Sequence, residues 1–445
     1  MSYKSYLREY QQKILEHTLS LTEQNYRAFY NAGDVGVGKT PTTIYTINEL
    51  AKPSYHILCV TNGSTRTNWG REIFKHSSTP NTLEVYSAKD ISLLTPQHSW
   101  VVISYALLNK PKTLKKLLDW KFDILLCDES QALTNYKSKR TQICLALGAL
   151  SKFMFWLSAT PVRKSLSDMY PFLRFSKPNE VQEYYAYLDK FCIKQSSYYG
   201  SGITYSKGKN FPEFRELIKP LFIRTKKEDV IDEMPALTYD KILLKGNKKI
   251  LKEINEERET KKFKTFINSM GETERKPIPH NLADFRRRSY MAKHEDCKEF
   301  VENLLNQDIP VIVAYFFHET LDFIMEEYKN WSPRCIKGST PSKKRQQYVD
   351  EFNNGEKLLL VGQIKSIGVG LNIHHTCSTV VVCETSYEPD DLSQLAGRVH
   401  RYGQTKPCTM YVLTLQDSID EDIVDILMSK TRLIIKAIDH RRDEE

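Results

Sequence analysis

Residues 33–40 read G-D-V-G-V-G-K-T, with four residues between the outer glycines and with Lys39 and Thr40 directly after the second of them. This spacing is typical of a phosphate-binding loop, in which backbone N–H groups surround the phosphates, the lysine neutralises them and the hydroxyl ligates Mg²⁺. A strand-like stretch at residues 28–32 precedes the loop, and a helix-like stretch at residues 42–50 follows it. This order predicts an α/β fold with a nucleotide at the turn. For the loop alone, the alternative is an ordinary strand-to-helix turn.

A pair of carboxylates supports the nucleotide prediction. The apolar run at residues 123–127 ends on Asp128 and Glu129, within D-E-S-Q at residues 128–131. Solvated carboxylates are unexpected at the end of a buried strand. We therefore predict that Asp128 holds Mg²⁺ and that Glu129 orients or activates the attacking water. The expected ligands of the phosphates and the metal in this half of the chain are Gly33, Gly36, Gly38, Lys39, Thr40 and Asp128, with Thr40 and Asp128 on the metal.

The composition indicates a globular chain with more than one core. Its 445 residues are too many for one ordinary domain. No apolar run is long enough to span a bilayer, and the first residues lack the apolar core of a signal peptide. The nine cysteines include no C-x-x-C pair, which favours reduced thiols in a cytosolic setting and argues against a zinc site. The net charge of +9 fits a polyanionic partner, but by itself it fits a basic surface equally well.

Apolar strands alternate with amphipathic helical stretches in both halves of the chain, which predicts parallel sheets. The expected strands lie near residues 57–61, 100–104, 123–127 and 153–158, and then near residues 311–316, 357–361, 379–383 and 409–413. Between the two halves, residues 165–300 are rich in Tyr and Lys and show no clear strand. Basic clusters occur there at Lys261, Lys262, Lys264 and residues 286–288, and we favour a solvated helical face over a nucleic-acid contact for them.

Residues 394–404 read Q-L-A-G-R-V-H-R-Y-G-Q. Arg398 and Arg401 are three positions apart, which predicts that they share one face of a helix. The fixed charge and forked geometry of arginine suit bidentate contacts with phosphate. In a chain with one phosphate loop and two lobes, such arginines can complete the nucleotide site from the opposite lobe. Taken alone, the pair would be better interpreted as solvated helix residues.

In order and spacing, these elements resemble the Swi/Snf-type ATPases of helicase superfamily two over nearly the whole chain. Residues 7–11, L-R-E-Y-Q, resemble the adenine-contacting motif of that family. The other matching stretches are residues 57–69 continuing to Glu72, 104–105, 128–135, 158–161 (S-A-T-P), 221–230, 338–340 with Arg345, 366–372 and 394–404. The short helical insertion looks most similar to the compact fork-remodelling, strand-annealing branch.

The resemblance implies roles for further residues. Gln11 would read the adenine base, Gly370 and Gln394 would contact the nucleotide, and Arg398 and Arg401 would reach the γ-phosphate. Together with Lys39, Asp128 and Glu129, the two arginines make up the expected catalytic set. The implied DNA contacts are Asn62, Arg66, Ser104, Thr340, Arg345 and Lys365, whose small polar and basic side chains suit a sequence-independent grip on the DNA backbone.

One departure concerns the acidic motif, which in the family usually ends in Gly/Ala-His but here ends in Ser130-Gln131. Glutamine donates and accepts hydrogen bonds but carries no charge. We expect Gln131 to keep the contact between lobes with altered coupling. No phosphate or metal ligand is lost, so the chain is expected to be an active ATPase.

The implied fold is α/β, with two RecA-like parallel-sheet lobes in tandem and a helical insertion between them. We expect the first lobe at residues 1–164, the insertion and linker at 165–300, and the second lobe at 301–445. The implied activity is ATP- and Mg²⁺-dependent translocation by a monomer on duplex or forked DNA, targeted by a protein partner, without a membrane, in the cytoplasm or a eukaryotic nucleus. The alternatives are a strand-separating DNA helicase and a nucleotide-switched partner-binding module with low turnover.

Overall fold

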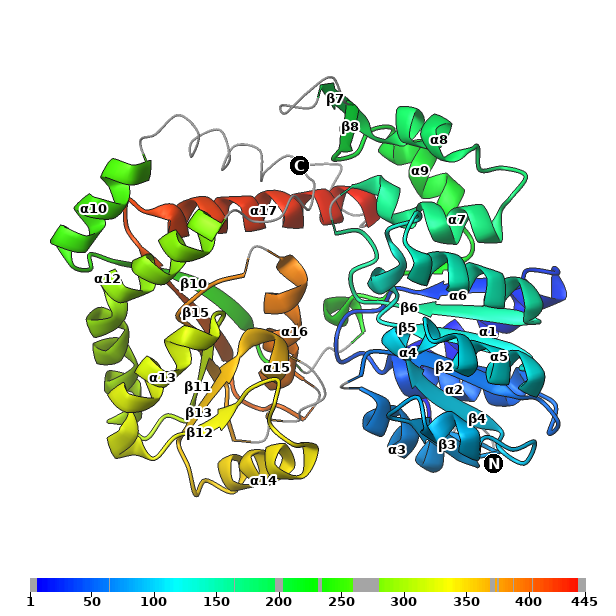
Figure 1. The fold of residues 1–445 in the computed structure, drawn as a ribbon, viewed down its shortest axis with the longest axis horizontal. Helices are drawn as coiled ribbons and strands as arrows, with labels where there is room; N and C mark the ends of the chain where they lie inside the picture. Colours follow the sequence, from blue (N-terminus) through cyan, green and yellow to red (C-terminus); the bar gives the residue numbers. More distant parts are fainter. Residues whose placement is uncertain are drawn as a thin grey trace. The chain divides into compact units, whose positions relative to one another are not determined.

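The computed structural model describes residues 6–63, 65–163, 165–196, 203–230, 234–258, 280–368, 373, 376–386, 388–401 and 403–438. Its contacts divide the chain into two units, Met1–Val230 with Leu433–Glu445, and Ile231–Arg432. Each unit contains its own parallel sheet (Figure 1). The expected fold class, two parallel-sheet lobes in tandem, is therefore confirmed. The proposed insertion at residues 165–300 is shared between the two units.

The sheet of the first unit has seven parallel strands in the order β3-β4-β2-β5-β6-β1-β9. The strands β2 and β4 are buried along their whole length, because helices cover both faces of the sheet. The strands are β1 (Ala28–Asn31), β2 (Ile57–Thr61), β3 (Thr82–Val85), β4 (Trp100–Ser104), β5 (Ile124–Asp128), β6 (Phe153–Leu157) and β9 (Phe222–Ile223).

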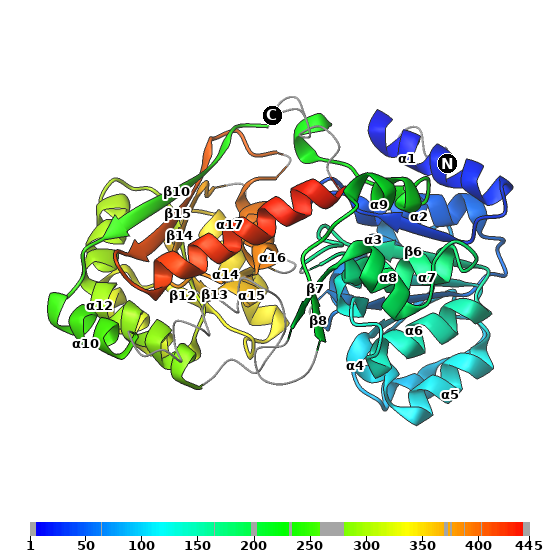
Figure 2. The same cartoon turned by 90° about the horizontal axis from the view of Figure 1, so that it is seen from above.

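Right-handed crossovers decide which face of this sheet each helix covers. The connections through α2 and α3 run along the sheet in one direction and those through α5 and α6 run in the other, so the two pairs lie on opposite faces (Figure 2). The helices of the unit are α1 (Glu9–Glu23), α2 (Lys39–Leu50), α3 (Arg66–His76), α4 (Tyr105–Leu108), α5 (Pro111–Trp120), α6 (Lys139–Leu150), α7 (Tyr170–Ser176), α8 (Tyr184–Phe191) and α9 (Phe211–Ile218). An antiparallel hairpin, β7 (Ile193–Ser196) with β8 (Ile203–Ser206), follows α8.

The sheet of the second unit has six parallel strands in the order β10-β15-β14-β11-β13-β12. They are β10 (Leu237–Leu244), β11 (Val311–Tyr315), β12 (Arg334–Ile336), β13 (Leu359–Gln363), β14 (Thr379–Val382) and β15 (Cys408–Leu415). The helices are α10 (Lys248–Arg258), α12 (His280–Leu305), α13 (His318–Glu327), α14 (Ser342–Asn353), α15 (Ile364–Ile367), α16 (Pro389–Val399) and α17 (Ile419–Ile438). Short 3-10 turns occur at η2 (Asp90–Leu93), η3 (Ser130–Leu133), η4 (Leu166–Met169), η5 (Lys227–Asp229) and η6 (Lys329–Trp331).

The expectation that residues 165–300 contain no clear strand is wrong. The strand β10 pairs with β15 over eight residues, and β7, β8 and β9 also lie in this segment. The strand β10 is an edge strand, and Tyr239 and Leu243 on it are about half exposed. Charged and polar side chains are therefore interspersed along it, and the continuous apolar run that marks a central strand is missing.

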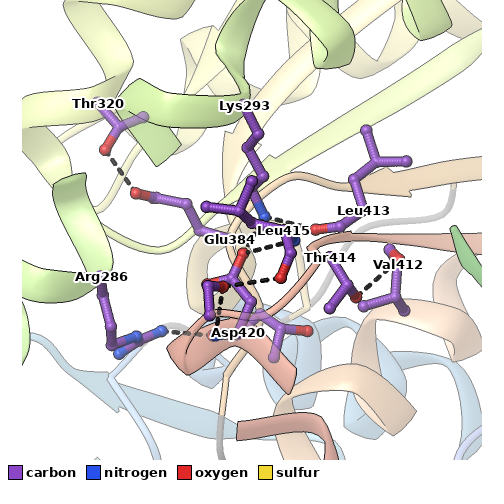
Figure 3. Close-up of polar contacts among 11 residues, drawn as sticks. Arg286, Lys293, Thr320, Glu384, Val412, Leu413, Thr414, Leu415 and Asp420 are labelled. Carbon is purple, nitrogen blue, oxygen red and sulfur yellow. Dashed lines mark hydrogen bonds and ion pairs between the residues drawn. The ribbon is translucent and has the colours of Figure 1, made fainter. Parts of the chain in front are cut away.

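A buried polar cluster fixes the carboxyl ends of three strands of the second sheet (Figure 3). The side chain of Lys293 on α12 is 2% exposed and donates to Asp420 Oδ2 at 2.6 Å and to the Leu413 carbonyl. Glu384, just after β14, accepts from the Thr320 hydroxyl at 2.8 Å and from two backbone N–H groups at the start of α13. Because these charges are paired and hydrogen-bonded, their burial is tolerated.

Within the described residues, no helix combines the length and the apolarity needed to cross a bilayer.

Candidate active site

The glycine-rich loop joins β1 to α2, as its sequence predicts. Gly36 and Gly38 have φ angles of 91° and 77°, a left-handed conformation that favours glycine. Gly38 is also the N-cap residue of α2, and a Cβ there would lie 2.3 Å from Gln11 Nε2. The loop therefore leads directly into a helix N-terminus, whose free N–H groups and positive end suit an anion.

Lys39 turns back over this loop. Its Nζ donates to the carbonyl oxygens of Gly33 at 2.6 Å and Asp34 at 2.9 Å. Burial lowers the pKa of Lys39, and the carboxylates of Glu129, Asp34 and Asp128 act in the opposite direction. Lys39 and the Asp128-Glu129 pair thus form one electrostatic site, as predicted from two separate stretches of sequence.

Asp128 ends β5 and is held by hydrogen bonds from the chain around β2. The Thr61 hydroxyl and Trp69 Nε1 both donate to Asp128 Oδ2 at 2.8 Å, and the Tyr105 hydroxyl donates to the Asp128 carbonyl. Burial, together with the neighbouring Glu129, raises the pKa of Asp128 to about 6. A cation at this carboxylate would offset both effects.

Glu129 is linked to the strand that follows by a chain of side-chain hydrogen bonds. Gln131 Nε2 donates to Glu129 Oε2 at 2.6 Å, and the Ser158 hydroxyl donates to Gln131 Oε1 at 2.7 Å. The backbone N–H of Thr160 donates to Ser158 Oγ at 3.0 Å. The amide of Gln131 therefore connects the acidic motif to the S-A-T-P stretch within the first unit. Its contact with the second unit stays a prediction.

Gln11 lies against the phosphate loop. Its Oε1 accepts from the Arg8 N–H at 2.9 Å, and its Nε2 donates to the Val37 carbonyl at 3.2 Å. The Tyr10 hydroxyl donates to the same carbonyl at 2.9 Å. The start of α1 and the loop are thereby joined, while the reading of an adenine base by Gln11 stays a prediction.

Residues 224–227, which follow β9, hold the phosphate loop through Asp34. Arg224 Nη1 lies 2.8 Å from Asp34 Oδ1 and donates to the Ala32 carbonyl at 2.6 Å. Two backbone bonds add to this pair, from the Asp34 N–H to the Thr225 carbonyl and from the Lys227 N–H to Asp34 Oδ2. We call this set the Arg224–Asp34 clamp.

The donor set around the loop fits Mg²⁺. Thr40 is the second residue of α2 and is half-buried, and Asp128 supplies one carboxylate. Over the residues that the structure describes, no group of three or more His, Cys, Asp or Glu side chains could hold a metal. Mg²⁺ is commonly bound by one or two carboxylates together with the phosphates of its nucleotide.

In the second unit, Arg398 is on the last turn of α16, and its Nε donates to the Gly368 carbonyl at 3.0 Å. The prediction that Arg398 and Arg401 share a helix face is wrong, because α16 ends at Val399. The chain then turns, with the Gln404 N–H bonded to the Arg401 carbonyl and with Gly403 at a φ of 93°. An added Cβ at Gly368 would lie 3.5 Å from the Cβ of Gln394, so Gln394, Gly368 and Arg398 are neighbours. Gly370 lies outside the described residues.

The predicted DNA contacts of the first unit gather at the carboxyl ends of β2 and β4, which are neighbours with Thr61 opposite Ser104. Asn62 is exposed, whereas Ser104 is only 7% exposed. The Arg66 guanidinium donates to the carbonyls of Gly63 at 3.1 Å and Val85 at 2.6 Å. Arg66 thus holds its own loop, and contact of these residues with DNA stays a prediction.

The predicted DNA contacts of the second unit lie after β12 and β13, which are also neighbouring strands. Thr340 Oγ1 accepts from the Lys337 N–H at 3.0 Å, and Arg345 Nη2 donates to the Lys337 carbonyl at 3.4 Å. Lys365 is exposed on α15, with its Nζ 3.9 Å from Asp391 Oδ2.

The basic clusters around the gap between α10 and α12 are described only in part. Arg287 and Arg288 pair with Glu319 and Glu257 at 2.8 Å, as expected of a helical face. The expectation of a solvated face is wrong for Arg286, which is 5% exposed and donates to the Thr385 carbonyl. Lys261, Lys262 and Lys264 lie outside the described residues.

Sequence reasoning missed three residues that act on this site: Thr61, Trp69 and Arg224. All three lie inside stretches that resemble family motifs, but the resemblance gave a role only to Asn62 and Arg66 in the first stretch and to no residue in 221–230. The apolar pattern placed Thr61 at the end of a strand, and nothing local shows that it meets Asp128 from 67 residues away.

The SNF2-related domain model matches residues 10–294, and the helicase conserved C-terminal domain model matches residues 292–403. Chromatin remodeling factor mit1 of Schizosaccharomyces pombe is 24% identical over 93% of this chain and 32% of its own length. The SWI/SNF-related matrix-associated actin-dependent regulator of chromatin subfamily A-like protein 1 of Xenopus tropicalis is 25% identical over 91% of this chain and 42% of its own length. A solved SWI2/SNF2 ATPase core of Sulfolobus solfataricus, in complex with dsDNA, matches 97% of both chains with 18% identity and a TM-score of 0.45.

This chain thus spans less than half the length of these two curated relatives. The two family models follow one another along it, and the first alone covers more than half of its residues. The chain belongs to the family of proteins in which an SNF2-related domain is followed by a helicase conserved C-terminal domain.

Proposed function

We propose that this chain is a DNA-dependent ATPase that uses hydrolysis to move along double-stranded or forked DNA. The observation that carries this proposal is the site of the first unit, where Lys39 of the glycine-rich loop lies close to Asp128 and Glu129. Side-chain hydrogen bonds connect Glu129 through Gln131 to Ser158. The family of the chain supports both the nucleotide and the DNA.

The residues of the first unit divide the chemistry between them. Lys39 exchanges its two loop carbonyls for phosphate oxygens, and the N–H groups at the start of α2 receive the same anion. Thr40 and Asp128 would hold Mg²⁺, which would neutralise phosphate charge. Glu129 orients the attacking water, and the neutral amide of Gln131 keeps its carboxylate in position. None of these roles requires a movement of β1 or β5.

The second unit supplies the link to motion. Arg398 and Arg401 contact the γ-phosphate from their own unit, so that the closed arrangement depends on an intact triphosphate. Hydrolysis removes the bridge. If each unit holds the DNA backbone through the small polar and basic residues at its strand ends, repeated closure and opening moves the protein along the duplex. Fork remodelling, strand annealing or displacement of bound protein are the proposed consequences.

Steady-state ATP hydrolysis tests the proposal, measured without nucleic acid and with single-stranded DNA, duplex DNA, forked DNA or RNA. Strong stimulation by duplex or forked DNA is expected, followed by displacement of a triplex-forming strand. Stimulation by single strands alone would favour a strand-separating helicase instead. No stimulation by any of them would point to a binding module or a motor activated by a partner. Lys39→Ala and Glu129→Gln should each abolish turnover, and Glu129→Gln should still bind ATP.

A further inference from the structure

The loop between β2 and α3 is attached to Asp128 at both of its ends. Thr61 is the last residue of β2, and Trp69 lies one turn into α3. Both donate to the same atom, Asp128 Oδ2, at 2.8 Å. The residues between these two donors include Asn62 and Arg66, the candidate DNA contacts of this loop.

Both donors are buried, so their bonds are strong and costly to lose. Thr61 is 0% exposed and Trp69 is 1% exposed. In such surroundings a hydrogen bond to a carboxylate is stronger than in water, and an unsatisfied partner is penalised. Among the described residues, no side-chain donor reaches Asp128 Oδ1. The two bonds therefore orient the carboxylate and leave that oxygen for the metal.

A continuous path leads from the exposed loop to this carboxylate. The Thr65 hydroxyl lies 2.6 Å from the Thr61 hydroxyl, which donates to Asp128. Arg66 starts α3, and its bond to the Gly63 carbonyl and its position 4.6 Å from the Tyr86 ring hold the loop together. Because Trp69 is on the first turn of the same helix, a movement of the loop shifts both donors at once.

We propose that Thr61 and Trp69 are positioning residues through which DNA contact at Asn62 and Arg66 reorients Asp128, and that they thereby set how strongly DNA stimulates hydrolysis. This inference rests on the proposed function and adds the route by which the DNA is sensed. If DNA also changes the affinity for the nucleotide by this route, linkage requires that the nucleotide changes the affinity for DNA by the same factor, whereas the effect on kcat has no such reciprocity.

The test uses the full chain with Thr61→Val, Trp69→Phe and the double variant. Valine keeps the shape of threonine without the hydroxyl, and phenylalanine keeps an aromatic ring without the indole N–H. Trp100→Phe is the matched control, because Trp100 is 0% exposed and its Nε1 bonds to Ser77 Oγ at 3.0 Å, away from Asp128. Thr113→Val is the second control, since within the described residues the buried Thr113 hydroxyl has no partner.

Two quantities are measured for each protein: the ratio of kcat with saturating duplex DNA to kcat without DNA, and the change in DNA Kd on addition of a non-hydrolysable ATP analogue. Couplings between two binding affinities are about 5- to 150-fold, which sets the scale for the change in DNA Kd. We expect the double variant to lose most of the DNA stimulation of kcat and most of the change in DNA Kd. The stimulated rate should fall about tenfold or more relative to the basal rate. The two controls should keep the wild-type ratio and coupling.

Equal losses of basal and stimulated rates, or an unchanged coupling, would overturn the inference, because the bonds would then serve only the site itself or the fold. If Trp69→Phe fails to fold, Thr61→Val alone decides in the same way. If the wild-type protein is not stimulated by any DNA, the proposed function fails first, and the inference falls with it.

Discussion

At Asp128, a neighbouring carboxylate and burial act on a single side chain, to which the proposed function also assigns Mg²⁺. Burial and Glu129 raise its pKa from the usual 3.8 to about 6, so without metal or nucleotide the charged form is disfavoured. Asp128→Asn removes that charge but keeps an oxygen for Thr61 and Trp69. We expect it to raise the free energy of unfolding of the first unit by about 1–3 kcal/mol at pH 8, since one pKa unit corresponds to about 1.4 kcal/mol.

The pH dependence of this gain follows from the sign of the shift. Below about pH 4 the carboxyl of wild type is protonated in both states, so the gain should be small. Between about pH 4 and pH 6 the folded wild-type protein binds the extra proton, and its stability falls as the pH rises, so the gain grows and then levels off. Urea unfolding at pH 4.5, 5.5 and 8 in EDTA measures this. A gain that is equal at all three pH values, or a loss, would contradict the assignment.

Gln131 is the residue that departs from the family pattern, and its two bonds make it testable. Gln131→Leu removes the partners of Glu129 and Ser158 together. We expect kcat to fall about 10- to 100-fold with ATP affinity nearly unchanged, because a contact that orients the water matters in the transition state. Gln131→His should retain more activity, since imidazole also donates and accepts. The exposed Gln142, changed to Leu, is the control. Full activity of Gln131→Leu would show that Glu129 needs no support.

Among the elements, the two-residue strand β9 has a role at the phosphate loop. It brings Arg224 to the phosphate loop. The last strand of the first unit therefore positions a loop that lies near the beginning of the chain. Arg224→Gln should weaken ATP binding about tenfold through loss of the clamp on Asp34, a partly buried, hydrogen-bonded ion pair. Titration with a fluorescent ATP analogue measures this effect.

The control for the clamp is Arg174→Gln. Arg174 also pairs with a carboxylate, Glu183 at 2.8 Å, and donates to two carbonyls, but these contacts lie at the end of α7. Both variants should lose comparable stability, and only Arg224→Gln should lose nucleotide affinity. An equal effect on affinity would mean that the clamp acts through the fold in general.

Central strands and the loop were predictable from the sequence, because local patterns determine them. The strands at 57–61 and 100–104 lie where the apolar runs predicted, since burial on both faces leaves polar residues only at their last positions, Thr61 and Ser104. The edge strand β10 was not predicted, because its solvent-exposed side chains include polar and charged residues that interrupt the apolar pattern. Arg401 was assigned to the helix by spacing alone, and the end of α16 at Val399 depends on the turn that follows. The bonds of Thr61, Trp69 and Arg224 join positions far apart in sequence, so they required the folded chain.

At the scale of the whole molecule, the proposed function divides the chemistry between two units. The loop and the carboxylates belong to the first unit, whereas Arg398 and Arg401 belong to the second, so neither unit holds a complete site under the proposed function. Nucleotide binding alone should therefore survive the loss of an arginine that turnover requires. The two arginines therefore differ from Lys39 in the expected effect of their loss. Loss of Lys39 should abolish turnover even when the second unit is intact.

Arg401→Ala makes that argument measurable. We expect its DNA-stimulated turnover to fall about 10³-fold or more, as for other arginines that complete a phosphoryl-transfer site, while its Kd for ATP stays within about threefold of wild type. ADP with aluminium fluoride should reduce the radius of gyration of the wild-type protein in X-ray scattering more than that of Arg401→Ala, because the variant keeps only one of the two proposed bridging arginines. Arg287→Ala, which removes a surface partner of Glu319, should behave as wild type in both measurements. If Arg401→Ala compacts as much as wild type and still turns over, the γ-phosphate is not the bridge, and closure must be driven by contacts of the units with DNA.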